Sequence, residues 1–110
     1  MKNFIQPGNT VTVLAPADVA SGDGVLVGGI FGVAAFDAAS GAEVEITRTG
    51  VFSMAKTSAQ AWTAGAKVYW DATNKVLTTT ASGNTLVGCA LEAAANPSDT
   101  GVALLDGAAR

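Results

Sequence analysis

The stretch Glu43-Val44-Glu45-Ile46-Thr47-Arg48 decides the fold class of this chain. Apolar and polar side chains alternate along it, so Val44 and Ile46 share one face while the two glutamates and the threonine share the other. A period of two residues is typical of a β-strand that buries one face. A turn-favouring pair at 49–50 follows, and then a second β-favouring run at 51–54. This order predicts a hairpin and, with it, an antiparallel sheet.

Short β-favouring runs recur along the rest of the chain, separated by turns rich in glycine, asparagine, serine and aspartate. They lie at residues 10–14, 25–27, 30–36, 67–70, 75–79, 86–91 and 102–105. Turn signals at intervals of roughly 8–12 residues are typical of a small sandwich or barrel. The intervening turns predict that 67–70 pairs with 75–79, and that 86–91 pairs with 102–105.

No long segment has the 3.6-residue period of a helix, and the best candidates for short helical turns are 57–62 and 93–95. We therefore predict an all-β fold, a small β-barrel or sandwich of short antiparallel hairpins with an N-terminal arm and at most one or two helical turns. The length of 110 residues fits one domain. Residues 1–16 are predicted to form the arm, either apart from the sheet or as part of it, and residues 17–110 a single β domain.

The chain has no histidine and one cysteine, Cys89. The commonest general base, the commonest metal ligand and every paired-thiol site are therefore missing. Glu43 and Glu45 lie about 7 Å apart along one strand face, but alternating exposed acids occur on most half-buried strands. We predict no enzyme activity, no catalytic residue, no cofactor and no metal site.

Charged residues make up only 14% of the chain, and hydrophobic residues 49%. The net charge is -3 and the six cations are scattered, so nucleic-acid binding is not expected. The longest apolar run, 25–36, is interrupted by glycines and is shorter than the roughly 20 residues of a membrane span. With no signal peptide recognisable at the N-terminus, we expect no membrane association. A sparsely charged surface on a small domain favours self-association or docking on a larger body.

Seven apolar or aromatic residues are the candidates for such an interface. Phe4 and Ile5 precede a Pro-Gly break and have little local core to join. Val11 and Val13 share one face of the first predicted strand. The large aromatic residues of the second half are either core residues or interface anchors, with sugar or base stacking as a further alternative; they are Trp62, Tyr69 and Trp70.

Several segments together resemble, in order, a family of small tailed-phage and prophage proteins. One of them is Trp62-Thr63-Ala64-Gly65-Ala66-Lys67-Val68-Tyr69-Trp70-Asp71, and the others are residues 1–11, 21–28, 50–52 and 86–90. The family is known as DUF2190, or as capsid cement or head decoration proteins. It is sometimes labelled a RecA/RadA-like recombinase, a label that this sequence does not support because it lacks a phosphate-binding loop and basic character.

The resemblance implies a non-enzymatic β-rich protein on the outer capsid surface of the virion, made in the host cytoplasm. Its partner would be the major capsid protein, whose neighbouring subunits it would clamp. Such proteins are often homotrimers, and a dimer is the alternative. We hypothesise that residues 1–15 belong to the capsid or inter-subunit contact. The alternative function is a carbohydrate- or receptor-binding module on the virion surface, with the aromatic residues as its platform.

Overall fold

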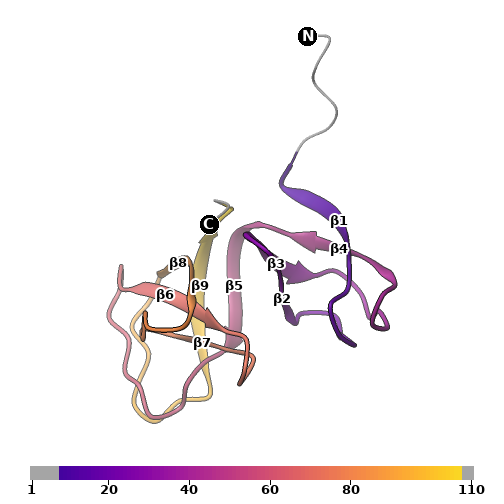
Figure 1. Cartoon of the computed structure of the whole chain (residues 1–110). Helices are drawn as coiled ribbons and strands as arrows, with labels where there is room; N and C mark the ends of the chain where they lie inside the picture. The colour runs from indigo at the N-terminus through magenta and orange to yellow at the C-terminus, as the bar shows by residue number, and fades with distance from the viewer. Residues whose placement is uncertain (1–7, 108–110) are drawn as a thin grey trace, which may run out of the picture.

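The computed structural model describes residues 8–107, and these residues contain nine β-strands and no helix. The all-β prediction is therefore confirmed (Figure 1). The strands are β1 (Thr10–Leu14), β2 (Gly24–Val27), β3 (Ile30–Ala34), β4 (Glu43–Thr47), β5 (Thr49–Ala55), β6 (Lys67–Asp71), β7 (Val76–Thr78), β8 (Thr85–Ala90) and β9 (Thr100–Asp106).

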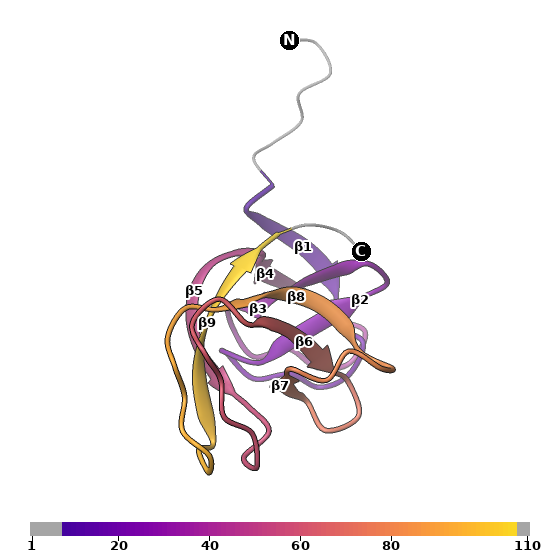
Figure 2. The same cartoon turned by 90° about the vertical axis from the view of Figure 1, so that its left-hand side faces the viewer.

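The strands form two antiparallel sheets. The first has the order β1-β4-β3-β2, and we call it the four-stranded sheet. The second has the order β5-β9-β8-β6-β7. It curls until the chain after β5 meets β7 at a parallel bridge between Lys56 and Leu77, so we call it the half-barrel. Figure 2 shows its curvature from the side.

Pairing between neighbouring strands is confirmed for the predicted pairs β6–β7 and β8–β9. The predicted hairpin of 43–48 with 51–54 is wrong, because β4 pairs with β1 and β3 whereas β5 pairs with β9. Only Arg48 separates β4 from β5, which is too short a connection to reverse the chain. The alternation along 43–48 correctly predicts a half-buried strand, but it does not predict which strand pairs with it.

The two predicted helical turns are also wrong. Residues 57–62 and 93–95 contain no helix, and they lie against each other at an isolated bridge between Trp62 and Ala94. The amide nitrogen of Trp62 donates to the carbonyl oxygen of Ala94 at 2.9 Å, and that of Ala94 to Trp62 at 3.1 Å. Segments this short gain little from helical hydrogen bonds. Bonding across to a second segment therefore prevails over local propensity.

The four-stranded sheet separates two apolar cores. On one face Phe31 and Val33 join the core of the half-barrel. On the other face Val44 and Ile46, both fully buried as the alternation predicts, form a second core with Val25. The segments that follow β1 and β3 cover this second core. A single sheet thus serves both cores because its strands alternate their side chains between two faces.

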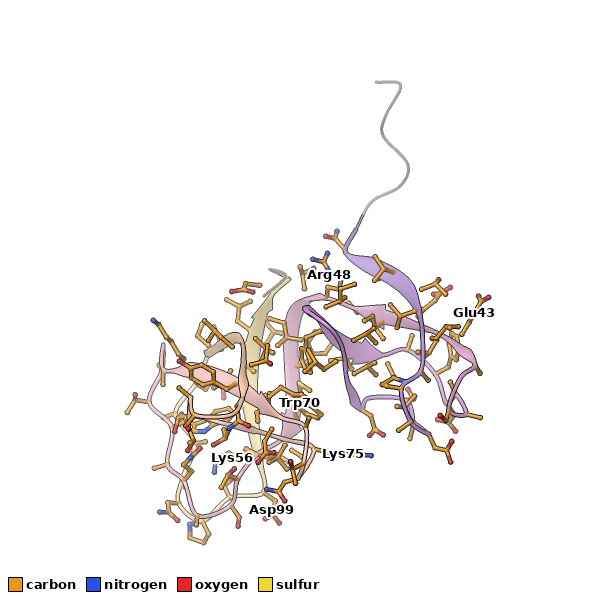
Figure 3. The ribbon with its side chains drawn as sticks, in the orientation of Figure 1. Glu43, Arg48, Lys56, Trp70, Lys75 and Asp99 are labelled. Atoms are coloured by element: carbon orange, nitrogen blue, oxygen red, sulfur yellow. The ribbon has the colours of Figure 1, made fainter. Side chains whose placement is uncertain are left out.

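Arg48 links the two sheets at the point where the chain passes from one to the other (Figure 3). Its guanidinium group donates hydrogen bonds to the carbonyl oxygens of Gly8, just before β1, and Gly107, just after β9. The sequence shows Arg48 only as the end of an alternating strand. Its role follows from the tertiary structure.

Candidate functional site

The structure distributes the predicted interface residues over both halves of the molecule. Trp62 and Trp70 are 2% and 6% exposed and belong to the core of the half-barrel. Tyr69 is half-buried on β6. Val11 and Val13 are half-buried on β1 and pack against the second core. The predicted residues Phe4 and Ile5 lie outside the described residues.

The open edge of β1 is the first candidate surface. In antiparallel pairs, successive residues alternate between hydrogen bonding toward the partner strand and pointing away from it. Asn9 accepts a hydrogen bond from the amide of Arg48, and the amide of Ala15 donates to Ala42, so the odd-numbered residues bond to the β4 side. The backbone groups of Thr10, Thr12 and Leu14 therefore point away from β4. An edge of this kind can accept an additional strand.

Leu14 gives this edge an apolar end. Its side chain is 62% exposed, the highest value among the large hydrophobic residues of the described chain. It stands opposite Glu43 in the pairing of β1 with β4. Val11 and Val13, on the other face, are held by the second core. The edge therefore presents both outward-pointing backbone groups and one exposed apolar side chain.

A strip of apolar residues on the outer face of the half-barrel is the second candidate surface. Val51 on β5 stands opposite Leu104 on β9, and Leu104 stands opposite Cys89 on β8. Val51 is 53% exposed and Leu104 38%, whereas Cys89 is half-buried. The sequence did not reveal this strip, because its members come from three strands and β5 is far from β8 and β9 in the chain.

A buried lysine, Lys56, organises the loops of the half-barrel (Figure 3). Lys56 is 3% exposed, and its Nζ donates hydrogen bonds to three carbonyl oxygens, those of Thr57, Gln60 and Ser98. The Nζ also lies 5.8 Å from the centre of the Trp62 ring. The lysine thereby joins the loop after β5 to the loop before β9. Nothing in the sequence distinguishes it from an exposed lysine.

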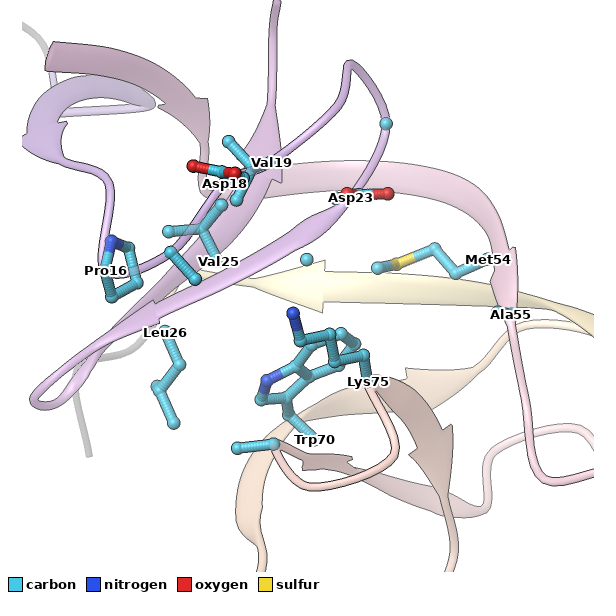
Figure 4. A pocket seen from close by; sticks show the side chains of 14 residues that line it. Pro16, Asp18, Val19, Asp23, Val25, Leu26, Met54, Ala55, Trp70 and Lys75 are labelled. Atoms are coloured by element: carbon cyan, nitrogen blue, oxygen red, sulfur yellow. The ribbon is translucent and has the colours of Figure 1, made fainter. Parts of the chain in front are cut away.

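A cavity of about 320 Å³ lies where the two sheets meet (Figure 4). Its apolar walls come from both sheets and include Val25, Leu26, Met54 and Trp70. Gly24 also lines the cavity and packs directly on Trp70, because a Cβ atom at this position would lie 2.7 Å from the indole ring. The sequence analysis did not predict this cavity.

Three charged residues line the same cavity. Asp18 accepts a hydrogen bond from the amide of Ser40 at 2.8 Å, and Asp23 accepts one from the amide of Ala20 at 2.9 Å. Each bond uses one oxygen of the carboxylate. Lys75 lines the cavity from the turn between β6 and β7. Within the described part of the chain, none of the three forms an ion pair.

A comparison with known protein families assigns this chain to one of them. Residues 5–105 match the family described as phage cement protein. The chain belongs to the phage cement protein family. This membership confirms the prediction that the chain is a structural protein associated with a phage capsid. It implies a virion location and a non-enzymatic role.

The other comparisons found no match, either among curated proteins or among solved structures. Within residues 8–107, no group of three or more metal-binding side chains comes together. The same residues include no helix long and apolar enough to cross a membrane.

Proposed function

We propose that this protein decorates the outer surface of an icosahedral phage head, binds the major capsid protein and stabilises the contacts between neighbouring capsid subunits. The match to the phage cement family over residues 5–105 carries this proposal. Many copies of a small domain, each with a modest footprint, would reinforce the shell through avidity. The protein would be made in the host cytoplasm and then bind to the outer surface of the head.

The open edge of β1, together with residues 1–9 that precede it, is the proposed capsid contact. A strand of the capsid protein would pair with the outward backbone groups of Thr10, Thr12 and Leu14. The exposed side chain of Leu14 would be buried in the same contact. Phe4 and Ile5 would supply further apolar surface. This agrees with the hypothesis from the sequence that residues 1–15 form part of the interface.

Self-association into a homotrimer is part of the proposal, with a dimer as the alternative. The strip of Val51, Leu104 and Cys89 supports it, because three neighbouring strands present apolar side chains to solvent there. The alternative function of sugar binding receives less support. Both tryptophans of the chain are buried, so neither offers an exposed ring for stacking.

Co-sedimentation with purified heads of the encoding phage tests the proposal. Unexpanded and expanded heads are incubated with the protein, and bound copies are counted. We expect saturable binding in a fixed ratio to the major capsid protein. Intact, folded protein that binds neither form of the head would overturn the proposed function.

Replacing Thr12 with proline tests the contact at β1. Proline removes the outward N–H at a position that does not bond to β4, so the sheet itself should remain intact. Loss of one hydrogen bond at about 1 kcal/mol predicts roughly fivefold weaker binding to heads. Thr12→Val keeps the N–H and is the matched control. Equal affinities of the two variants would exclude strand pairing at this edge.

A further inference from the structure

We propose that the cavity between the two sheets is a socket for a lysine or arginine side chain on the capsid surface. This inference rests on the proposed function and deepens it by assigning a second contact with a defined chemistry. The cavity volume of about 320 Å³ lies at the small end of the range for ligand pockets, which suits one long side chain.

The walls of the cavity match the two parts of such a side chain. Leu26, Met54 and Trp70 provide apolar surface for its aliphatic stem. Asp18 and Asp23 provide the acidic wall for its head group. Since each carboxylate is fixed by a backbone N–H through one oxygen, the other oxygen is available for a charge-assisted hydrogen bond.

The charge of the surrounding surface favours a cationic partner. Residues 8–48, which contain the four-stranded sheet and the acidic wall, carry five carboxylates and one cation, Arg48. Such an excess attracts positively charged groups and disfavours anionic ones. An apolar side chain of the partner would leave both carboxylates without a counterion.

Lys75 already places one exposed lysine side chain at the lining of the cavity. In Figure 4 its side chain lies in front of Trp70, which also lines the cavity. Its backbone has φ 57°, the left-handed conformation that side chains with a Cβ atom rarely adopt. Glycine or asparagine would suit that turn position better. Strain of this kind is often retained at functional positions. We infer that Lys75 covers the socket in the free protein and is displaced by the partner's cation.

This role for Lys75 leads to an unusual expectation, because removing a charged residue should strengthen binding. Lys75→Gly empties the socket and relieves the backbone strain, so we expect a higher melting temperature and roughly tenfold tighter binding to heads. Lys67→Ala removes the same charge from a position outside the cavity and is the control. Unchanged or weaker binding by Lys75→Gly would contradict the proposal.

The acidic wall is tested by the double substitution of Asp18→Asn and Asp23→Asn. Asparagine keeps an oxygen that can accept the backbone N–H, so the fold should be preserved. We expect roughly tenfold weaker binding to heads and a weaker dependence of binding on salt. Asp37→Asn is the matched control, because Asp37 also accepts a backbone N–H, from Ser21, but does not line the cavity. Equal losses in both variants would contradict the socket.

A capsid-free measurement separates failure of the socket from failure of the proposed function. The Lys75→Gly protein is titrated with butylguanidinium, and the indole N–H signal of Trp70 is followed by NMR. A saturable shift is expected for Trp70 and not for Trp62, and it should disappear when Asp18→Asn and Asp23→Asn are added. An equal shift with neutral butanol, or in the protein without the two aspartates, would overturn the socket even if heads are bound.

Two further outcomes show which of the two proposals fails. If butylguanidinium binds as expected but the wild-type protein does not bind heads, the capsid assignment of the socket fails together with the proposed function. If Lys75→Gly makes the free protein self-associate in sedimentation experiments, the socket accepts a second copy and the capsid assignment is overturned.

Discussion

The four-stranded sheet and the half-barrel differ in how completely they close. The half-barrel curls until Lys56 bridges to Leu77, and its core contains both tryptophans of the chain. The four-stranded sheet stays open at β1, whose outward backbone groups have no partner strand in the sheet. A sheet whose ends curl toward each other leaves less edge for another chain, whereas an open edge such as β1 can accept an additional strand.

The two halves also differ in charge. Residues 8–48 carry five carboxylates and one cation, whereas residues 49–107 carry four carboxylates and three lysines. One of those lysines, Lys56, is buried and serves the half-barrel itself. The comparison suggests a division of roles in which the half-barrel holds the structure and the four-stranded sheet makes the contact.

The largest difference in stability should appear when a leucine is replaced by alanine in each half separately. Leu77 is fully buried in the half-barrel, whereas Leu14 is exposed at the edge of the four-stranded sheet. We expect Leu77→Ala to reduce the free energy of unfolding by about 2–5 kcal/mol. Leu14→Ala should change it by less than about 0.5 kcal/mol but weaken binding to heads. Urea unfolding and co-sedimentation measure the two effects, and equal stability losses would contradict the division of roles.

Lys56 should give the next largest effect. Lys56→Met has a similar shape but leaves the carbonyl oxygens of Thr57, Gln60 and Ser98 without their common donor. We expect a loss of about 2–3 kcal/mol in the free energy of unfolding, because buried acceptors without partners are costly. Lys67→Met, on an exposed position of β6, is the control and should be nearly neutral. If both substitutions have the same effect, the buried lysine does not stabilise the half-barrel loops.

The smallest effect concerns the turn between β6 and β7. Hydrogen bonds from the backbone and side chain of Asn74, and from the backbone of Thr73, lower the pKa of Asp71 below its ordinary value. Since the folded pKa lies below the unfolded one, the stabilisation is present above the unfolded pKa, about 4, and is lost as pH falls through the folded value.

Thermal unfolding of Asp71→Asn tests this contribution. The variant should melt slightly below the wild type at pH 7, and the difference should shrink as the pH falls below about 4. A difference that stays constant with pH would show that the charge of Asp71 does not contribute.

The local parts of the fold could be predicted from the sequence. Val44 and Ile46 are buried as the alternation around them indicates, and β6–β7 pair across a short turn. The partners of β4 and β5 could not be predicted, because alternation specifies a buried face and not the neighbouring strand. The bridge between Trp62 and Ala94 joins segments more than 30 residues apart, which local helix propensity does not reveal.

The candidate site was only partly predictable. The sequence predicted that residues 1–15 form part of a contact, and the structure places β1 at a sheet edge. The cavity was missed because Asp18, Met54, Trp70 and Lys75 are far apart in the sequence and meet only when the two sheets pack. The burial of Trp62 and Trp70 was one of three interpretations of the large aromatic residues, and the sequence alone did not distinguish core, interface and stacking platform.

A cryo-EM reconstruction of phage heads saturated with the protein tests the division of roles most directly. We expect β1 and the cavity between the two sheets to face the major capsid protein, with the loops joined by Lys56 directed away from the shell. A reconstruction in which those loops contact the shell, while the edge of β1 faces solvent, would contradict it.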